Sequence, residues 1–389
     1  MINFQDYDVV VVGAGLSGAV FARYYADEGK KVLVLEKRNH IAGNLYDYMD
    51  EKGNRVQKYG PHSFHTNYEE VNSYVNKYSE WENYILFCNV FMHGKFTPSP
   101  FNFKTIEQYY DKDEAALLKK TLLEEYPNRN SVTIVELLKS TNKLVREYAN
   151  FLFESDYSLY TAKQWGISPS QVDPEVLKRV PVLLNYDEQY FYDRYQTIPV
   201  NGFTSFIANI LDSNNIKVIT NYDCMRSLSL KSNKTYFDDI EYNGIVIYTG
   251  EIDRLFDYKY GPLPYRSLKF EMKTERIKSF QNAPVVAYPE DKNFIRITEY
   301  TKMPYQDNEW TSYAIEYSQQ YIAGENEPYY PVNNEINNKI YDSYYNETRK
   351  YKNIILAGRL AKYKYFNMDQ VVLDVMNEIK SIGGHIKWK

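Results

Sequence analysis

The hydrophobic pattern at the two ends of the chain predicts one α/β unit. The segment from Asp8 to Val12 contains four consecutive valines, which is typical of a strand buried on both faces of a parallel sheet. Helical apolar spacing follows from Leu16 to Asp27, and Lys31 to Glu36 is again a buried strand. Because Lys352 to Gly358 predicts another strand and Asp369 to Ile379 another helix, we expect the last residues to complete the unit that the first residues begin.

The middle of the chain has two other patterns. Between Ile106 and Glu154, helix-forming and charged residues keep a helical apolar spacing, with a turn at Pro127 to Asn130. From Val180 to Pro199 and from Leu268 to Tyr317, aromatic and β-branched segments alternate with turn residues, which favours an antiparallel sheet. No linker-like segment separates these parts, so we expect a helical insertion and a sheet insertion that pack on one core.

Composition narrows the class of protein. The chain has 389 residues, of which 44% are hydrophobic and 25% charged, as expected for a globular protein of two or three domains. A net charge of -5 disfavours a general nucleic-acid binder. The apolar run ending at Val12 is far shorter than the roughly 20 residues needed to span a bilayer, and no basic segment precedes it. We therefore expect a cytoplasmic protein with no membrane partner, in which Cys88 and Cys224 are buried thiols.

A glycine-rich turn follows the first predicted strand. Gly13, Gly15 and Gly18 fit the dinucleotide fingerprint, in which glycines allow a tight turn, approach of a pyrophosphate and close packing of helix on strand. The helix that follows directs its N-terminal amides and the positive end of its dipole at that pyrophosphate. Glu36 ends the second strand. There its carboxylate can accept hydrogen bonds from both hydroxyls of an adenosine ribose, and it would repel a phosphate on that ribose. FAD or NAD is therefore favoured over NADP.

The loop after the second strand favours FAD. Lys37, Arg38, Gly43 and Asn44 lie in a basic loop that contains glycine and could wrap the nucleotide. A larger cofactor buries more of its surface and needs a longer segment of chain to line its site, so this loop indicates FAD rather than NAD. We therefore predict an α/β fold: a Rossmann-type FAD-binding core with an inserted helical bundle and an inserted antiparallel β-sheet domain.

We expect three discontinuous domains. The FAD-binding domain takes residues 1–90, 200–250 and 335–389. The helical insertion takes 91–165. The sheet domain, which would bind substrate, takes 166–199 and 251–334.

Seven segments carry motifs that occur together in one family. They are EKRNHIAGN at 36–44, KYGPHSFHT at 58–66, KQWG at 163–166, YFYDRYQ at 190–196, YRSLKF at 265–270, PYYP at 328–331 and GRL at 358–360. In this order they resemble the prokaryotic UDP-galactopyranose mutase family, and the resemblance runs from residue 8 to about residue 375.

The resemblance implies a flavoenzyme that interconverts the pyranose and furanose forms of a nucleotide-diphospho-sugar with no net redox change. In the family, N5 of the reduced FAD attacks the anomeric carbon and expels the nucleoside diphosphate, which leaves a covalent flavin–sugar adduct. The sugar ring opens and recloses through another hydroxyl before the diphosphate returns. This is nucleophilic catalysis by the cofactor, so the protein's task is electrostatic stabilisation of the leaving diphosphate. Bacterial relatives are often homodimers, so we expect one here.

The resemblance to this family also implies the site residues. The catalytic set is Arg179 and Arg296, which would bind the diphosphate, with His62 and His65 on the flavin side. The substrate-binding set is Tyr160, Trp165, Tyr190, Tyr330, Tyr365 and Asn367. The cofactor-binding set adds Arg266, Arg359 and Met368 to Gly13, Gly15, Gly18, Glu36, Lys37, Arg38, Gly43 and Asn44.

The histidine pair leaves two interpretations open. One ring could lie against the flavin and stabilise its reduced, anionic state through a hydrogen bond, or the histidines could only pack in their loop. Metal binding by His62 and His65 is disfavoured, because the preceding Gly60 and Pro61 indicate a loop and no third ligand is near in the sequence. We expect no metal site.

The sequence departs from the family around the substrate. Asn367 stands where the family usually has Asp, Leu183 replaces a common arginine, Ala287 takes the place of an expected Asn, and Tyr157-Ser158-Leu159 precede Tyr160 in place of the usual residues. These changes leave three substrates open: UDP-galactopyranose, TDP-fucopyranose and UDP-N-acetylgalactosamine. An amine-oxidase-like flavin oxidoreductase and a non-catalytic binding protein are the alternatives from other classes.

Overall fold

A five-stranded parallel sheet forms the base of the molecule. The computed structural model describes residues 2–166, 180–291 and 293–384. In this sheet the strands follow the order β12 (Ile216–Ile219), β2 (Val32–Leu35), β1 (Val9–Val12), β16 (Ile245–Tyr248) and β22 (Ile354–Leu356). Neighbouring strands are all parallel, and β1 and β2 are buried valine and leucine runs of the kind such sheets require.

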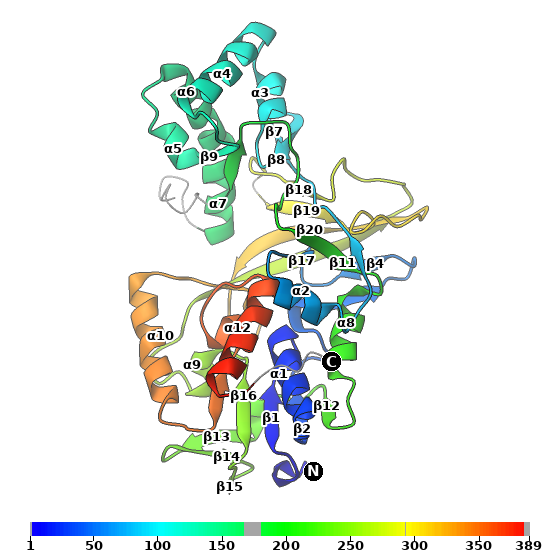
Figure 1. Cartoon of the computed structure of the whole chain (residues 1–389), viewed down its shortest axis with the longest axis vertical. Coiled ribbons are helices and arrows are strands. Elements are labelled where there is room, and N and C mark those ends of the chain that lie inside the picture. The colour runs from blue at the N-terminus through cyan, green and yellow to red at the C-terminus, as the bar shows by residue number, and fades with distance from the viewer. Residues whose placement is uncertain (1, 167–179, 292, 385–389) are drawn as a thin grey trace.

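Helices cover one face of this sheet. They are α1 (Leu16–Asp27), α2 (Glu69–Val75), α8 (Gly202–Leu211) and α12 (Met368–Ser381), of which α1 contacts both α8 and α12 (Figure 1). Val9 and Val11 point into this core, while Val10 points to the other face, as the alternation of a strand requires. The predicted α/β unit is confirmed, including its completion by the C-terminal strand and helix.

Smaller elements pack against the opposite face. An antiparallel ribbon of β13 (Leu228–Lys231), β14 (Lys234–Phe237) and β15 (Ile240–Glu241) shares its core with α9 (Ile252–Leu255) and α10 (Glu335–Thr348). Val10, Leu33 and Leu35 from the parallel sheet enter the same core. The sheet is therefore buried on both faces, as its sequence predicts.

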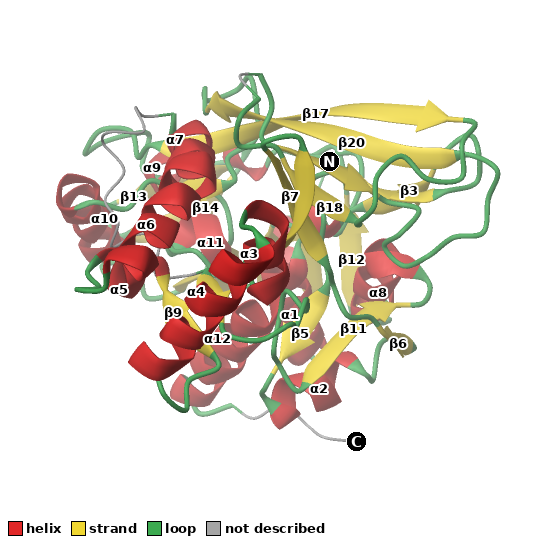
Figure 2. Ribbon diagram, turned by 90° about the horizontal axis from the view of Figure 1, so that it is seen from above, coloured by secondary structure: helices red, strands yellow, loops and turns green. Residues whose placement is uncertain are grey.

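A seven-stranded mixed sheet lies above the parallel sheet in the view of Figure 1. Its order is β21 (Tyr330–Pro331), β17 (Tyr265–Glu275), β20 (Thr311–Gln320), β19 (Arg296–Glu299), β18 (Val285–Ala287), β7 (Cys88–Met92) and β8 (Lys95–Ser99). β18 pairs with β7 in parallel, and the other pairs are antiparallel. Figure 2 shows β17 and β20, its longest strands, lying side by side.

A helical part lies beyond this sheet, at the top of Figure 1. Its elements are α3 (Phe103–Tyr109), α4 (Lys112–Glu125), α5 (Ile134–Leu138), α6 (Lys143–Leu152), a π-helical turn (Phe153–Tyr157) and α7 (Ser158–Trp165). They share one apolar core, and a ribbon of β9 (Ser131–Thr133) with β10 (Pro181–Leu183) adjoins it. The predicted turn at Pro127 to Asn130 separates α4 from β9.

Short elements connect the three parts. A three-stranded sheet joins β5 (Phe64–Thr66), β11 (Tyr195–Pro199) and β6 (Trp81–Asn83), and β3 (Asp47–Met49) pairs with β4 (Arg55–Gln57). Single helical turns occur at Phe4–Asp6, Gly43–Leu45, Cys224–Arg226 and α11 (Gly358–Ala361).

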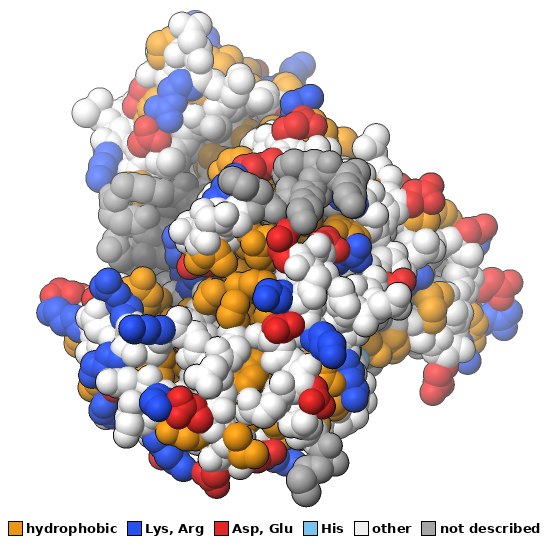
Figure 3. All heavy atoms as spheres, turned by 60° about the horizontal axis from the view of Figure 1, so that its bottom comes forward, with side chains coloured by type: hydrophobic (Ala, Val, Ile, Leu, Met, Phe, Trp, Pro, Cys, Tyr) orange, Lys and Arg blue, Asp and Glu red, His pale blue; other side chains and the backbone are white. Residues whose placement is uncertain are grey.

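The expected domain boundaries stay a prediction, and two strands bear on them. The hairpin of β7 and β8 spans the expected boundary at residues 90 and 91 and pairs with the seven-stranded sheet. Among the described residues, no helix has the length and apolar character needed to cross a membrane. On the face drawn in Figure 3, acidic and basic side chains are interspersed, so this face carries no broad field of one sign.

Candidate functional site

The turn between β1 and α1 can be built only from glycine at two positions. Gly13 has a φ of +104°, and a Cβ there would overlap the hydroxyl of Thr249, which donates a 2.7 Å hydrogen bond to the carbonyl of Val12. A Cβ on Gly18 would overlap the carbonyl oxygen of Gly13. Both glycines therefore bring α1 close to the sheet and leave its N-terminus open, as a pyrophosphate requires.

The second predicted loop closes on this turn. The N–H of Ala42 donates to the carbonyl of Ala14 at 2.9 Å, and a Cβ on Gly43 would lie 3.1 Å from the Cα of Gly15. Gly43 has a φ of +55°, so glycine serves both the backbone conformation and the close approach. Gly15 and Gly43 thus form two facing walls at the N-terminus of α1.

Glu36 is held in place by the backbone. One carboxylate oxygen accepts from the N–H of Ala14 and the other from the N–H of Arg38, each at 2.9 Å. Glu36 is buried, yet it lines the first of two cavities. Each oxygen keeps a free lone pair, so the carboxylate can still accept hydroxyl donors from a ligand.

The basic loop is pinned by an acidic residue that the sequence did not single out. Arg38 donates from Nη2 to Asn44 at 3.0 Å and to Glu327 at 2.7 Å, and Lys37 lies 3.5 Å from the same glutamate. Nη1 of Arg38 is buried and has no hydrogen-bond partner among the described residues. An orphaned donor at this wall is suited to a polar ligand group.

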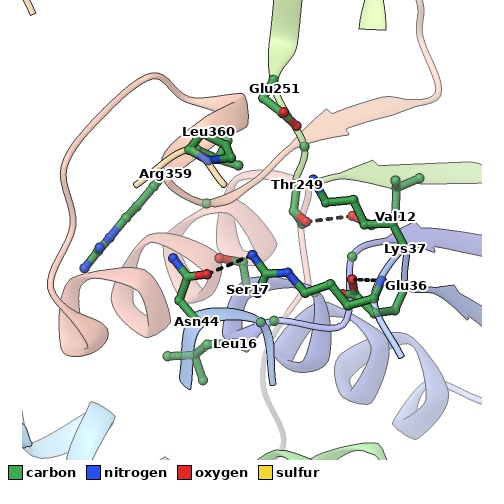
Figure 4. Close-up of a pocket in the computed structure, with 18 of the residues that line it drawn as sticks. Val12, Leu16, Ser17, Glu36, Lys37, Asn44, Thr249, Glu251, Arg359 and Leu360 are labelled. Atoms are coloured by element: carbon green, nitrogen blue, oxygen red, sulfur yellow. Dashed lines mark hydrogen bonds between the residues drawn. The ribbon is translucent and has the colours of Figure 1, made fainter. Parts of the chain in front are cut away.

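The first cavity runs from Glu36 to Arg359. Figure 4 shows these two side chains at opposite ends of the pocket, with Ser17, Leu16 and Asn44 along its floor. Arg359 is fixed by a 2.7 Å hydrogen bond from Nε to the carbonyl of Phe366. An elongated ligand would therefore extend from the carboxylate end to the guanidinium end.

His62 lies where the first cavity meets the second. Its Nδ1 is 2.9 Å from the carbonyl oxygen of Gly60, which can only accept, so Nδ1 carries the proton and Nε2 is an acceptor. Burial lowers the pKa of His62 to about 3, with Arg359 and Arg296 adding to the shift. The ring is thus neutral, and the positive charge at this junction comes from the arginines.

His65 lies in β5 and lines the second cavity only. Its Nδ1 is 2.8 Å from an oxygen of Asp193, whose other oxygen accepts from Asn67 at 2.6 Å. The ring stacks on Phe191 with centroids 3.7 Å apart. Asp193 and Phe191 therefore fix the orientation of this imidazole.

A buried ion pair defines the second cavity. Nε of Arg296 on β19 is 2.7 Å from a carboxylate oxygen of Glu316 on the neighbouring strand β20, and Glu316 is only 2% exposed. Burial alone would lower the pKa of Arg296, but the Glu316 carboxylate raises it well above the usual value. The pairing leaves both Nη groups without a hydrogen-bond partner in the described part of the chain.

Tyrosines surround this guanidinium. Tyr160, Tyr190 and Tyr330 line the same cavity, and their hydroxyls have no hydrogen-bond partner within residues 2–166, 180–291 and 293–384. Burial raises the pKa of Tyr160 to about 12 and raises those of Tyr190 and Tyr330 as well. The hydroxyls therefore stay protonated and can donate to an anion that Arg296 binds.

One wall of the second cavity is apolar. Leu86, Cys88, Val285 and Met303 form a small buried cluster, and all four line the cavity. Ala287 lies beside them at the end of β18. Cys88 is a free thiol whose pKa burial raises to about 12, so it contributes to this wall as an apolar group.

The two cavities are joined. His62, Arg359 and Met368 line both, so a ligand that fills the first can reach the second at these residues. Arg266 lines the second cavity, where it donates to the carbonyl of Gln164 at 3.1 Å and to the hydroxyl of Ser318 at 2.6 Å.

The remaining predicted residues divide into three groups. Tyr365 and Asn367 line the second cavity, and Arg359 lies over the ring of Tyr365 at 4.7 Å. Trp165 ends α7. Arg179 lies outside the described residues. Within the described chain, no cluster of three or more His, Cys, Asp or Glu could hold a metal ion.

Glu316 and Glu327 were missed at the level of sequence. The sequence did offer one signal for Glu316, which lies between apolar neighbours in β20. A charged residue at a strand position that faces a core usually has a partner of opposite charge. Glu327 has no local signal, since its partners lie almost 300 residues earlier in the chain. Both acidic residues act by holding an arginine.

These features define a dinucleotide-fold protein whose cofactor cavity opens into an anion-binding cavity. A family model described as UDP-galactopyranose mutase matches residues 156–365, and one described as an NAD(P)-binding Rossmann-like domain matches residues 11–78. The chain is 33% identical to the UDP-galactopyranose mutase of Mycoplasma genitalium, over 96% of this chain and 94% of that protein. It is also 33% identical to the dTDP-fucopyranose mutase of Escherichia coli, over 95% and 96%.

A solved structure agrees in fold. The crystal structure of a reduced UDP-galactopyranose mutase matches with a TM-score of 0.72 at 17% identity, and the match covers 97% of this chain and 96% of that one. The chain belongs to the UDP-galactopyranose mutase family. It is an isomerase with a flavin-type cofactor site, and the predicted family and enzyme class are confirmed.

Proposed function

We propose that this chain binds FAD in the first cavity and interconverts UDP-galactopyranose and UDP-galactofuranose while the flavin is reduced, through a covalent flavin N5–sugar adduct. The observation that carries the proposal is the position of Arg296. Its guanidinium is oriented by buried Glu316 in a cavity that joins the cofactor cavity at His62 and Arg359.

The residues present fit FAD. The open N-terminus of α1 between Gly15 and Gly43 suits the pyrophosphate, and Glu36 suits the hydroxyls of the adenosine ribose. The flavin ring would then lie toward Arg359, at the end of the cavity opposite Glu36. The chemistry that a reduced flavin supplies when bound is nucleophilic attack on the anomeric carbon of the sugar.

The chain's own residues would stabilise the departing nucleoside diphosphate. As the glycosidic bond breaks, negative charge gathers on the diphosphate, and the two free Nη groups of Arg296 can donate to its oxygens. Tyr160, Tyr190 and Tyr330 supply neutral donors around the same anion. Because Glu316 already orients the guanidinium, little reorganisation accompanies the reaction. Arg179 is the second diphosphate arginine that the resemblance implies.

A second substrate is favoured by one specific observation. The apolar wall of Leu86, Cys88, Val285 and Met303 offers no partner to a sugar hydroxyl, and a hydroxyl buried there would lose its hydrogen bonds to water. A 6-deoxy sugar avoids that cost. TDP-fucopyranose is therefore the alternative substrate, with the same chemistry, and UDP-N-acetylgalactosamine is the third candidate.

An anaerobic substrate panel tests the proposal. The purified flavoprotein, with and without dithionite, is incubated with UDP-galactose, TDP-fucose and UDP-N-acetylgalactosamine, and the products are separated by chromatography. We expect an isomer of equal mass from one of these substrates, formed only with dithionite. Net oxidation of the substrate, as from an amine-oxidase-like enzyme, or isomer formed only by the oxidised flavin, would contradict the proposal.

The remaining expectations are a homodimer and a cytoplasmic location. The resemblance supports the first. Light scattering on the purified protein tests the dimer, for which we expect twice the chain mass of 46.0 kDa.

A further inference from the structure

A carboxyl group lines the second cavity on the side that the helical part forms. Asp156 belongs to the π-helical turn between α6 and α7, and it lines the cavity together with Asn89, Ser99, Val180 and Ala287. A π-helical turn inserts a residue into a helix and is often found at functional sites. Here it places an acidic side chain in a wall formed by the helical part.

Among the residues that the structure describes, no salt bridge involves this carboxyl. Oδ1 of Asp156 is shielded from solvent and has no hydrogen-bond partner among the described residues. Lys163 is the cation whose charge acts to lower the pKa of Asp156. Its Nζ donates hydrogen bonds to the carbonyls of Asp291 at 2.7 Å, Phe294 at 2.9 Å and Tyr288. An ammonium has three donors, so Lys163 is fully used. A buried polar group without a partner points to a ligand.

Within residues 2–166, 180–291 and 293–384, the groups around the turn offer this carboxyl no pairing cation. The buried titratable groups nearest to it stay neutral, because burial raises their pKa values: Tyr157, Tyr148, Tyr160 and Cys88. Glu154, in the same turn, is exposed and acidic. Beside the turn, His93 contacts Ser155 at 2.8 Å and Glu290 at 3.1 Å. Burial raises the pKa of Asp156 to about 7, against the opposing effect of Lys163. A large fraction of the carboxyl therefore keeps its proton near neutral pH.

The position along the cavity identifies the part of the ligand that this carboxyl would meet. In Figure 1 the dinucleotide part, with α1 and β1, lies at the bottom, β19 lies in the middle, and α6, which leads into the turn that carries Asp156, lies at the top. A nucleotide-diphospho-sugar is linear. With the sugar at the cofactor junction and the diphosphate at Arg296, the nucleobase reaches Asp156.

We propose that Asp156, in its neutral form, recognises the imide edge of a uracil or thymine base. Its carbonyl oxygen accepts from the base N3–H, and its hydroxyl donates to the adjacent base carbonyl. An ionised carboxylate could accept from N3–H but would face two base carbonyls, whereas it would suit the paired N1–H and N2–H donors of guanine. The inference rests on the proposed function, because the linear placement assumes a nucleotide-diphospho-sugar.

Binding of UDP-galactose as a function of pH tests this role. Calorimetric titration of the oxidised, flavin-loaded enzyme from pH 6 to 9 avoids turnover, and the diphosphate of a nucleotide sugar does not titrate in that range. We expect the dissociation constant of the wild type to rise toward tenfold per pH unit at the alkaline end, where the carboxyl must take up a proton to bind.

Two substitutions separate recognition from a structural effect. Asp156→Asn keeps a donor and an acceptor without titrating, so it should bind within about threefold of the wild type at pH 6 and lose the pH dependence. Asp156→Ala should weaken binding roughly tenfold at pH 6. Glu154→Gln, at an exposed carboxylate in the same turn, is the matched control and should behave as the wild type. An N3-methylated UDP-galactose should bind the wild type as weakly as UDP-galactose binds Asp156→Ala.

The outcomes distinguish this inference from the proposed function. If the wild type binds UDP-galactose and Asp156→Ala binds it equally well with the same pH profile, the role of Asp156 is wrong while the mutase proposal stands. A different result would assign another base. If GDP-galactose binds more tightly than UDP-galactose, if its binding strengthens as the pH rises, and if Asp156→Asn loses that binding, the carboxylate is ionised and recognises guanine. If the wild type binds none of these nucleotide sugars, both proposals fail.

Discussion

At the scale of single residues, the site depends on charges that neighbouring residues hold in place. Glu316 orients Arg296, Glu327 orients Arg38, and Asp193 orients His65. In each case the residue suited to contact a ligand was visible in the sequence. The glutamates that position Arg296 and Arg38 were not visible: Glu316 comes from the neighbouring strand and Glu327 from a segment 289 residues away. The pairing matters because preorganised donors stabilise a developing charge without first having to be oriented.

Removal of Arg296 should slow the reaction strongly. For Arg296→Ala we expect a loss of kcat/KM equivalent to about 2 to 4 kcal/mol, by analogy with deletion of an oxyanion donor. Glu316→Gln keeps a hydrogen-bond acceptor for Nε and should cost less, so it is the matched comparison. Isomerisation rates under dithionite measure both. A loss below tenfold for both Arg296→Ala and Arg179→Ala would refute the assignment of the diphosphate arginines.

His62 should make the folded protein sensitive to acid. Burial, with Arg359 and Arg296, lowers its pKa to about 3, whereas an unfolded histidine titrates near 6.5. Between these values the unfolded state binds the extra proton, so His62 contributes stability that is lost as the pH falls below about 6.5. We expect up to about 1.4 kcal/mol per pH unit from this residue.

Urea unfolding of the flavin-loaded enzyme between pH 6 and 4 measures this contribution. The free energy of unfolding of the wild type should fall more steeply with acidity than that of His62→Gln, which cannot titrate. Parallel curves for the two proteins would mean that His62 is protonated in the folded state.

At the scale of elements, the first turn and helix were the most predictable part of the chain. The helix expected from Leu16 to Asp27 is α1 with the same bounds, because local apolar spacing and the flanking glycines determine it. The antiparallel sheet was expected from its alternating segments, but its pairing with β7 was not. β18 and β7 lie almost 200 residues apart, and no local pattern specifies which strand pairs with an exposed edge.

Gly18→Ala should abolish flavin binding. The added Cβ would overlap the backbone carbonyl of Gly13, so α1 would have to move away from β1 and its N-terminus would leave the pyrophosphate position. We expect purified Gly18→Ala to lack the flavin absorbance near 450 nm while remaining folded by circular dichroism.

Gly29→Ala is the control for this prediction. Gly29 also has a positive φ, +78°, but a Cβ there meets no atom within 4 Å. Its substitution should cost about 1 kcal/mol of stability through backbone strain and leave the flavin bound. Equal flavin content in the two variants would show that close packing at Gly18 is not needed.

At the scale of the whole molecule, function follows from the way three parts meet. The parallel sheet presents the cofactor cavity, the seven-stranded sheet supplies Arg296 to the second cavity, and the helical part supplies Asp156 to it. The residues of the second cavity are scattered along the chain from Pro61 to Met368, so no local pattern could identify them. Those that were predicted came only from the resemblance to a known family. Asp156 had no motif, and only its lack of a partner in the folded chain identifies it.

The most direct test of the central claim is to trap the enzyme during turnover with sodium cyanoborohydride. The reduced flavoprotein is incubated anaerobically with radiolabelled UDP-galactose and the hydride donor, denatured, and its flavin is analysed by mass spectrometry. Our account predicts flavin that carries one hexose, and greatly reduced labelling in Arg296→Ala. Rapid isomerisation with flavin that carries no sugar would contradict it.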